Sequence, residues 1–353
     1  ELPYRVSTSK GTVKHLATEM RRAVDGYPVS PEWEAAFAWY AENERQTANL
    51  LIHGLTHSNI VDKLSQKAVL AAYDLPIKTS VSRLERFVEC PFKYFVESGL
   101  KPIPQKSYEL GAPDVGILFH SALEHFGKTI FNENIDWQTL TKDRSDAMME
   151  AIIGTITDVD IYHSRFQYQY MINKLKRVSK KAAWTLTQQL SSGAFVPTAF
   201  EVAFGDGPES VAPILVSLTN GERLLIRGVI DRVDTVEIEG KKYIKIIDYK
   251  SGRKSLSLSD IYNGLQMQLM VYLSACMDNP HYFKATEIAP AGAFYFRIDD
   301  PFIEATTQVE AIIQDKIASE LKLDGISLDD VKVLKHLDAN LFDQNVSNVI
   351  QVK

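Results

Sequence analysis

The stretch YIKIIDYKSGRKS, residues 243–255, ends a run of strand-forming residues with an acid and a base two positions apart. Side chains at positions i and i+2 of a β-strand point to the same face, so Asp248 and Lys250 are predicted to lie side by side. Tyr249 is predicted to point to the opposite face. An acid beside a base at a strand end is either a solvated ion pair or part of a reaction centre, and the rest of the chain has to decide between the two.

The bulk composition is that of a globular protein with a sizeable core. The chain has 353 residues, of which 45% are hydrophobic, and its length suggests roughly two domains. No apolar run approaches the roughly 18 residues that a membrane-spanning helix needs. The formal net charge of -6 argues against a uniformly basic protein. It is compatible with a local DNA-binding track, because the distribution of charge matters more than its sum.

Two further features bear on where the chain works and how it begins. The first residue is Glu1 and no signal peptide follows it, so we expect a fragment whose natural N-terminus lies upstream. The two cysteines, Cys90 and Cys276, are far apart in the sequence and do not make a disulfide framework. A reducing compartment fits this cysteine usage, so the sequence predicts a cytoplasmic protein without membrane association.

The order of predicted elements indicates an α+β fold. Residues 1 to about 75 are typical of helices and 74–80 of a connector, and the aromatic residues of the first part are predicted to form core: Trp33, Phe37 and Tyr40. Further helices are expected at 80–100 with a break at Cys90-Pro91, at 114–131, at 165–190 after a polar region, and at 259–277. Strands are expected at 199–205, at 214–250 with two hairpin turns, and at 292–298. This order predicts a sheet with helices packed against it.

Three acids fall near strand ends of the predicted sheet: Glu201, Asp231 and Asp248. Adjacent antiparallel strands lie about 5 Å apart, so Asp231 and Asp248 are predicted to bring their carboxylates together. Two carboxylates at that distance repel each other unless a proton or a cation lies between them. A hard divalent cation such as Mg²⁺ takes oxygen ligands. Lys250 would then stand beside the cation, where negative charge develops on a phosphate or an attacking hydroxide.

Two helices add polar residues at a spacing of one turn. His120 and Glu124 lie four residues apart before the sheet, and Gln268 and Tyr272 repeat that spacing after Asp248. Taken alone, His120 is more often a hydrogen-bonded helix histidine than a ligand. Gln268 and Tyr272, taken alone, can be a buried polar pair. Only the combination of these residues with the acids favours a functional site.

The residues belong to five motifs whose order and spacing are far more specific than any one motif. The motifs are GILFHSALE at residues 116–124, Glu201, GVIDRVD at 228–234, DYKSG at 248–252 and QLMVY at 268–272. The set resembles the RecB-like branch of the PD-(D/E)xK nucleases, which carries G-x-x-x-H-x-x-L-E, E, G-x-x-D-R-x-D, D-Y-K-[ST]-G and Q-x-x-x-Y in this order. The resemblance implies a restriction-endonuclease-like core, a mixed sheet flanked by helices, here preceded by a helical segment.

A further stretch narrows the resemblance. The sequence SVSRLERFVECPFKYFVESGLKP, residues 80–102, is similar to the start of the nuclease domain in the AddB (RexB) family. Members of this family are second subunits of AddAB helicase-nucleases, which process double-strand DNA ends. The resemblance covers roughly residues 78–345. It implies that residues 1–77 are the helical tail of a preceding helicase-like region and that residues 78–353 are the nuclease domain.

The resemblance also implies an iron–sulfur cluster, for which this sequence contains only one of the four ligands. In the family, the cysteine of the ECPF motif is one of four cysteine ligands of a 4Fe-4S cluster, and Cys90 occupies that position. The other three ligands lie in a C-terminal C-x-x-C-type motif, which this sequence lacks. Cys276 is predicted to pack as a small hydrophobic residue. We therefore expect a chain that ends before the cluster ligands and carries no cluster, with Cys90 as a free thiol.

The resemblance implies a role for each motif residue. One or two Mg²⁺ ions, or Mn²⁺, would be bound by side chains of His120, Asp231 and Asp248 and by the backbone carbonyl of Tyr249. Lys250 would orient the attacking hydroxide, and Gln268 and Tyr272 would hold the DNA backbone or groups around the metal. Glu201 is a weaker candidate, for a metal-bound water or for orienting Lys250. Arg232 and Asp234 are predicted to form a structural pair.

The implied function is a Mg²⁺-dependent deoxyribonuclease that cleaves single-stranded DNA fed by a partner helicase, in a heterodimer with an AddA-type subunit. The basic residues Lys174, Arg177 and Lys181 would follow DNA phosphates without reading bases. The alternative is a non-catalytic scaffold that keeps the nuclease fold and binds DNA or a partner. The intact set of Asp231, Asp248 and Lys250 favours the enzyme.

Overall fold

The computed structural model of the protein describes residues 6, 8–58, 63–73, 75–103, 111–205, 207, 210–252, 254–301, 310–344 and 347–351. The chain divides into two compact units, Glu1–Gln66 and Lys67–Lys353. This division lies ahead of residue 77, the boundary that the sequence predicts. Each unit has a hydrophobic core of its own.

The described part of the first unit is built from three helices, α2 (Ser9–Val24), α3 (Pro31–Asn43) and α4 (Arg45–Thr56). Pro31 stands at the start of α3, where its missing N–H costs no hydrogen bond. The buried core contains Trp33 and Tyr40, and Phe37 packs against it partly buried. The prediction that this aromatic set forms core is therefore confirmed.

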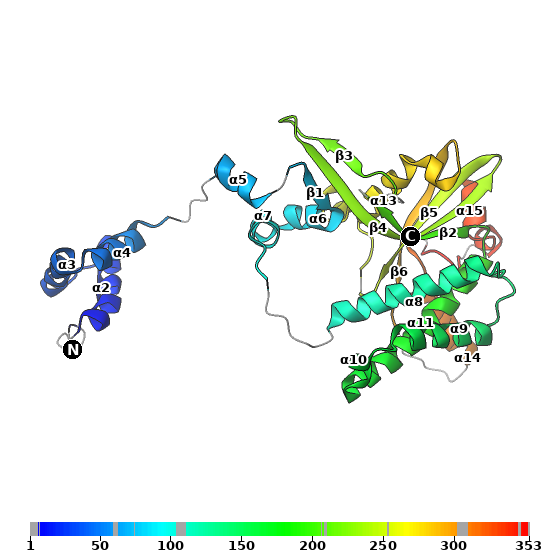
Figure 1. Ribbon diagram of the computed structural model, residues 1–353, viewed down its shortest axis with the longest axis horizontal. Helices are drawn as coiled ribbons and strands as arrows, with labels where there is room; N and C mark the ends of the chain where they lie inside the picture. The colour runs from blue at the N-terminus through cyan, green and yellow to red at the C-terminus, as the bar shows by residue number, and fades with distance from the viewer. Residues whose placement is uncertain are drawn as a thin grey trace. The chain divides into compact units, whose positions relative to one another are not determined.

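A mixed sheet forms the centre of the second unit (Figure 1). Its described strands are β1 (Ile77–Ser80), β2 (Val196–Phe204), β3 (Ile214–Ser217), β4 (Arg223–Ile238), β5 (Lys241–Lys250), β6 (Ile288–Arg297) and β7 (Asp324–Ser327). The long strand β4 pairs antiparallel with β2, β3 and β5 and parallel with β1. Strands β5 and β6 are parallel, and β7 closes the edge antiparallel to β6. A mixed sheet flanked by helices confirms the predicted fold class.

Helices pack against the sheet through two separate hydrophobic clusters. One cluster contains apolar residues of α8 (Ala112–Asn132), α9 (Lys142–Ile156), α11 (Phe166–Ser191) and α15 (Val331–Leu337). The other contains residues of α6 (Val81–Glu89) and α13 (Gln268–Met277). Shorter elements complete the unit: α5 (Gln66–Ala72), α7 (Pro91–Tyr94), η1 (Phe95–Leu100), α10 (Asp160–His163), α12 (Leu258–Tyr262), η2 (Pro280–Phe283), α14 (Glu310–Glu320) and α16 (Leu341–Gln344). The sheet therefore meets α8 and α13 in different clusters, and both helices carry motif residues.

Three segments differ from the sequence-based expectation. The region 132–164, described from the sequence only as polar, contains α9, which Thr141 caps and which buries Met149 and Ile153 against α8 and α11. The expected connector 74–80 ends in strand β1, because Ile77–Ser80 pairs with the start of β4. The expected single helix 259–277 is two helices separated at Gly264, whose φ of +75° suits a residue without a side chain. In the first two cases burial or strand pairing between distant residues, which local sequence does not report, decided the outcome.

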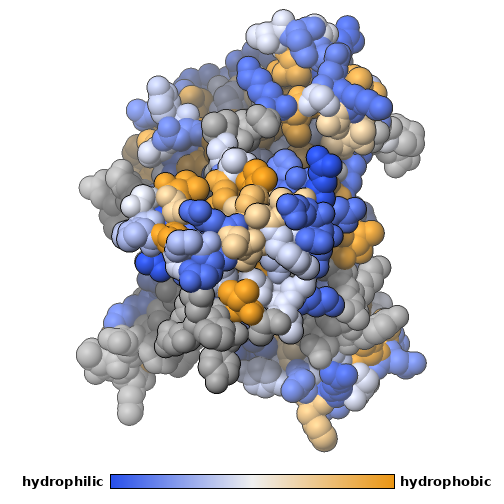
Figure 2. Space-filling view, turned by 90° about the vertical axis from the view of Figure 1, so that its left-hand side faces the viewer, coloured by the Kyte–Doolittle hydropathy of each residue, from blue (hydrophilic) through white to orange (hydrophobic). Residues whose placement is uncertain are grey.

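The face drawn in Figure 2 is mostly hydrophilic, with hydrophobic groups between the polar residues. Exposed large hydrophobic side chains are scattered over both units, which is normal for a globular protein. Within the described residues, every helix is too short or too polar to cross a lipid bilayer.

Candidate active site

Three neighbouring strands carry one carboxylate each at the same level of the sheet. Glu201 on β2 lies opposite Asp231 on β4, because the residues on either side of both pair with each other. Asp248 on β5 follows directly after the pair Arg232–Ile247, so it continues the register opposite Asp231. Residues directly opposite on neighbouring strands have Cβ atoms about 5 Å apart. The row Glu201, Asp231 and Asp248 therefore brings three acids together across β2, β4 and β5.

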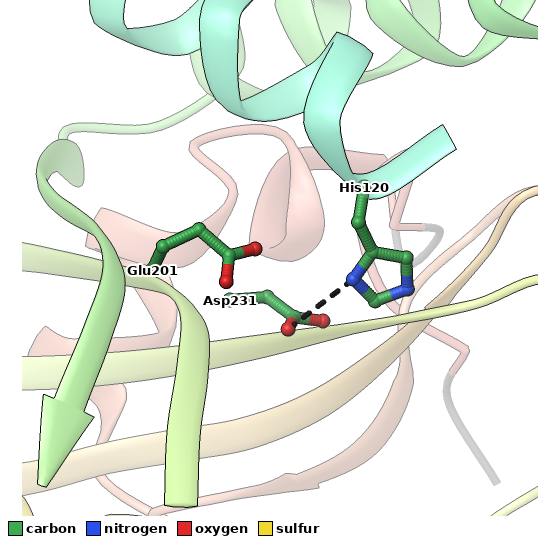
Figure 3. A group of neighbouring side chains, drawn as sticks. All are labelled: His120, Glu201 and Asp231. Atoms are coloured by element: carbon green, nitrogen blue, oxygen red, sulfur yellow. Dashed lines mark ion pairs between the residues drawn. The ribbon is translucent and has the colours of Figure 1, made fainter. Parts of the chain in front are cut away.

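Helix α8 adds a histidine to this row. The Nδ1 atom of His120 lies 3.4 Å from Oδ1 of Asp231, and Figure 3 shows the imidazole pointing to that carboxylate with Glu201 beside it. The ring of His120 also meets the ring of Tyr249 edge to face at 5.8 Å. Ligand atoms of His120, Glu201 and Asp231 all lie within 4.8 Å of one another. This group could hold a metal ion.

The backbone of Glu201 adopts a conformation that is rare for a residue with a side chain. Its φ is +49° in the middle of β2, in the left-handed region, where non-glycine residues cost on the order of 1 kcal/mol or more. Such strain persists where the surrounding structure holds it, and it is common at functional sites. Glu201 was the weaker candidate from the sequence, yet the structure places it in the same group as His120 and Asp231.

Asp248 faces Lys250 rather than joining the three-residue group. The Lys250 ammonium forms a close ion pair with Oδ2 of Asp248, and it also donates to Oε1 of Gln268 at 2.9 Å. Gln268 in turn donates through Nε2 to the hydroxyl of Tyr272 at 2.9 Å. Within the described residues, Asp248 Oδ2 receives no hydrogen bond of normal geometry, although the side chain is almost fully buried. A chain of polar contacts therefore runs from Asp248 to helix α13.

The site holds more negative charge than its surroundings offset. Burial, and then the charge of Asp231, raise the pKa of Asp248 to about 6. Burial, followed by Asp231 and Glu124, raises the pKa of Glu201 to about 7. Burial lowers the pKa of His120, but its hydrogen bond to Asp231 and the surrounding carboxylates outweigh that effect, so the pKa is raised. Each shift reports that the site favours added positive charge, as a proton or as a cation.

The backbone and the side chain of Tyr249 contact different residues. Its N–H donates to Oδ2 of Asp231 at 2.5 Å, which fixes that carboxylate from β5. Its phenol lies 3.5 Å from Nη1 of Arg232, which binds Asp234 through two hydrogen bonds of 2.7 and 2.8 Å. Lys245 also reaches Asp234, at 3.0 Å, and all three charged residues are buried. The predicted Arg232–Asp234 pair is confirmed as part of a buried charged triad.

Glu85 is a residue of the site region that the sequence did not single out. It lies on α6, and its Oε1 accepts the backbone N–H groups of Met267 at 2.7 Å and Gln268 at 3.1 Å. It therefore caps the start of α13 from another helix and holds the residue that contacts Lys250. No local pattern reveals such a cap, because the donor and acceptor are about 180 positions apart.

A pocket of about 450 Å³ opens beside the site between α8 and β2. Its lining residues come from the first two motifs: Gly116, Ile117, His120, Ser121, Glu124 and Glu201. The Cα of Gly116 faces Ser251, whose hydroxyl would lie 3.5 Å from an added Cβ. The glycine of the first motif thus lies next to the serine of the DYKSG motif. Glu124 pairs with Lys128 at 2.6 Å.

The basic residues of α11 lie near acids. Arg177 binds Asp300 at 2.9 Å and Lys181 forms a second close ion pair with it, whereas Lys174 is exposed. Two further lysines of α11 bind Glu150 at 2.6 Å, Lys176 and Lys180. DNA phosphates would therefore have to compete with carboxylates for much of this positive charge.

The two cysteines lie in different environments. Cys90 is half-buried at the start of α7, where its Sγ accepts the N–H of Lys93 at 3.5 Å. Cys276 is fully buried on α13, and burial raises its pKa to about 12. The prediction that Cys276 packs as a small hydrophobic residue is confirmed. The expected absence of an iron–sulfur cluster stays a prediction.

Comparisons with known proteins match both units of the chain. Residues 78–349 match the PD-(D/E)XK nuclease superfamily, and residues 4–54 match the fifth domain of the ATP-dependent helicase/deoxyribonuclease AddB. Relatives named as B-type subunits of an ATP-dependent helicase/deoxyribonuclease are 40% identical in Alkaliphilus oremlandii and 41% in Alkaliphilus metalliredigens, each over 95% of this chain. One from Clostridium botulinum strain Hall is 34% identical over 98% of the chain. The chain spans about 30% of the length of these relatives. It belongs to the PD-(D/E)XK nuclease superfamily and resembles these B-type subunits of helicase/deoxyribonucleases.

Proposed function

We propose that this chain is a metal-dependent deoxyribonuclease that cleaves single-stranded DNA at the centre formed by Glu201, Asp231 and Asp248. The observation that carries the proposal is the row of three carboxylates across β2, β4 and β5, with Lys250 paired to its last member. Such a row attracts a cation, and the lysine adds the positive charge that phosphodiester hydrolysis requires. Membership in the nuclease superfamily supports the same reaction class.

The donor set fits a hard divalent cation, and we propose Mg²⁺. His120, Glu201 and Asp231 would hold the ion, because their ligand atoms already lie within 4.8 Å of one another. Asp248 would join them with its carboxylate, because the strand register places it opposite Asp231 while Lys250 stays beside it. The raised pKa values of Glu201 and Asp248 fit a site that becomes stable when a cation replaces protons. When bound, Mg²⁺ supplies Lewis acidity at the scissile phosphate and eases deprotonation of the attacking water.

The protein side of the mechanism centres on Lys250. Its ammonium is held between Asp248 and the amide oxygen of Gln268, so its position is set by a strand and a helix. From there it stabilises negative charge on the attacking oxygen or on the phosphate. Tyr272 fixes the orientation of the Gln268 amide by accepting its N–H. The N–H of Tyr249 and the imidazole of His120 both contact the Asp231 carboxylate, and these contacts fix its orientation between Glu201 and Asp248.

The relatives' names support a proposal for the wider setting. We propose that the chain works as part of an AddB-type subunit of a helicase-nuclease, in a heterodimer with an AddA-type subunit that feeds it unwound DNA during double-strand break processing. The names of relatives that are 34 to 41% identical support this setting. Cleavage of a single-stranded oligonucleotide is the direct test. Mg²⁺ should support this cleavage, and EDTA or a substitution at Asp248 should abolish it.

Glu85→Ala is expected to lower kcat about ten-fold with KM changed by less than two-fold. Loss of the cap frees the start of α13, so Gln268 no longer holds Lys250 in its reactive position, whereas DNA contacts elsewhere stay in place. Steady-state cleavage assays well below the melting temperature measure both constants. Glu85→Gln keeps an acceptor oxygen and should restore most of kcat. The matched control is Glu89→Ala on the same helix, which removes only a surface pair with Lys93. Equal effects of the two alanine variants would contradict a positioning role for Glu85.

Glu201→Gln is expected to raise the melting temperature of the metal-free protein by a few degrees at pH 8. The pKa of Glu201 is raised from 4.5 to about 7, so the folded state binds this proton more tightly than the unfolded chain does. Ionised Glu201 therefore destabilises the fold above about pH 7, and this penalty disappears as the pH falls from 7 to 4.5. After allowance for solvent screening, it is on the order of 1 kcal/mol.

Thermal denaturation in EDTA at pH 8 and pH 4.5 measures this effect. The gain should be present at pH 8 and largely lost at pH 4.5, where the carboxyl is protonated in the folded state and half-protonated in the unfolded chain. The exposed Glu133→Gln variant should show no gain at either pH. An equal gain for Glu201→Gln at both pH values would show that relief of backbone strain or packing, not charge, is responsible.

A further inference from the structure

A second concave site lies in the same unit, beside strand β1 and the helical segment α6–α7–η1. It is a pocket of about 420 Å³. Two tyrosines and four basic residues contribute to its lining: Tyr73, Tyr94, Lys78, Arg83, Lys101 and Arg227. No acid is among the described residues that line it. We name it the Tyr94 pocket. None of the five nuclease motifs contributes to it.

Three cations of the Tyr94 pocket differ from their neighbours in having no carboxylate partner among the described residues. Arg83, Lys101 and Arg227 are exposed, and none of them forms an ion pair with an acid in that part of the chain. On the same helical segment, two other cations do have partners: Arg86 binds Glu97 at 2.5 Å and Lys93 lies 3.5 Å from Glu89. A concave surface with several unpaired cations attracts an anion. The cations of α11, by contrast, are largely taken up by Asp300 and Glu150.

The aromatic rings of the pocket are held in place and remain partly exposed. The rings of Tyr73 and Tyr94 are parallel within 7° with centroids 6.0 Å apart. Phe87 meets the ring of Tyr94 edge to face at 5.4 Å, which fixes its plane. Flat rings beside unpaired cations are the combination that binds single-stranded nucleic acid, because bases stack on the rings while phosphates meet the cations.

Strand β4 connects the Tyr94 pocket to the carboxylate row. Arg227 and Asp231 are four residues apart on this strand, and alternation of side chains places them on the same face, roughly 13 Å apart. Ser80 at the end of β1 pairs with Arg227, so the pocket is anchored to the strand that carries Asp231 (Figure 1). A span of that length corresponds to a few nucleotides of an extended single strand.

We propose that the Tyr94 pocket is a binding site for single-stranded DNA a few nucleotides from the bond that is cleaved. Bases stack against Tyr73 and Tyr94, and phosphates bind Arg83, Lys101 and Arg227. The site thereby holds the strand in line with the carboxylate row and contributes to affinity without reading sequence. The inference rests on the proposed function only in that the bound strand is also the substrate.

Equilibrium binding of a fluorescent oligothymidine in EDTA, followed by anisotropy, tests the proposal without cleavage. The double variant Arg83→Glu/Arg227→Glu should bind at least ten-fold more weakly than the unaltered chain. For this variant, the slope of log K against log salt concentration should be less steep by about 1.4. Two phosphate contacts are lost, and each contributes about 0.7 to the slope for single-stranded DNA. Tyr94→Leu should weaken oligothymidine binding about five-fold or more and leave binding of a base-free abasic strand unchanged. Arg83→Lys/Arg227→Lys should retain most of the affinity, and circular dichroism checks that all variants fold.

A closely matched pair of lysines provides the control. Lys101 and Lys284 are both exposed, end short helices, and adopt the left-handed backbone with φ of +50° and +53°. Lys101→Glu should weaken binding and Lys284→Glu should not. Equal affinity of all variants, or no binding by the unaltered chain, would overturn the proposal. Unchanged DNA binding with lost retention of the helicase subunit would assign the pocket to a protein contact and would overturn it as well. Failure of the proposed function is distinct, because it would appear as unaltered cleavage in an Asp248 variant.

Discussion

Replacing Asp248 with alanine is expected to lower metal-dependent cleavage of single-stranded DNA by at least about a thousand-fold. Asp248 is the member of the carboxylate row that also pairs with Lys250, so its loss removes a proposed cation ligand and the anchor of the lysine at the same time. A thousand-fold loss corresponds to about 4 kcal/mol of transition-state stabilisation, a reasonable size for a metal ligand. Asp248→Asn, which keeps the shape of the side chain and removes its charge, should have a similar effect.

The assay uses the chain in complex with the proposed AddA-type helicase subunit, after any nuclease centre of that subunit has been inactivated. Asp278→Ala, an exposed aspartate at the end of α13, is the control and should cleave normally. The fold should persist, because burial and Asp231 already disfavour ionised Asp248 in the metal-free protein. Undiminished cleavage by a well-folded Asp248→Ala variant would support the alternative of a non-catalytic scaffold.

Replacing Asp234 with alanine is expected to destabilise the second unit by about 3–5 kcal/mol. Asp234 is the single carboxylate of the buried triad, and its removal leaves Arg232 and Lys245 as two neighbouring cations without their shared partner. Burial already lowers the pKa of Lys245, which shows how little hydration this position has. Lys245 also lies over the ring of Phe195 at 4.9 Å, a contact that cannot replace the lost charge.

Urea denaturation of the variant and of a fully apolar replacement measures this effect. In the combined variant Arg232→Met/Asp234→Leu/Lys245→Met no buried charge is left unpaired, so it should be substantially more stable than Asp234→Ala. A loss of less than about 1 kcal/mol for Asp234→Ala would mean that water reaches the two cations and that the triad does not act as a buried unit. The variant also bears on the site, because Arg232 contacts the phenol of Tyr249, whose N–H binds Asp231.

Two contacts between motif residues could be predicted from local sequence. The strand periodicity of residues 243–250 predicted that Asp248 and Lys250 share a face, and the two side chains do form an ion pair. The helical spacing of Gln268 and Tyr272 predicted a pair, and the two are hydrogen bonded. Interactions over two or four positions follow from backbone geometry alone, so the sequence determined them.

The roles of the individual acids were decided by the tertiary structure. The sequence ranked Asp248 above Glu201 as a partner of Asp231, yet the compact ligand group contains Glu201 and His120, while Asp248 turns to Lys250. The left-handed backbone of Glu201 contributes to this arrangement, and no motif encodes it. Which carboxylate oxygens meet depends on strand register and on local strain, and both are set by packing between distant segments.

By itself, the sequence determined the superfamily, the mixed sheet with flanking helices, and the set of residues from which a nuclease centre can be built. Periodicity and motif order can be read from the sequence because they reflect backbone geometry and chemistry at fixed spacing. Only the tertiary structure decided that α9 and β1 form, that Glu85 caps α13, and that unpaired cations and tyrosines gather in the Tyr94 pocket. Each of these features joins residues far apart in the chain, and its free energy comes from burial, pairing or charge that exists only once the chain has folded.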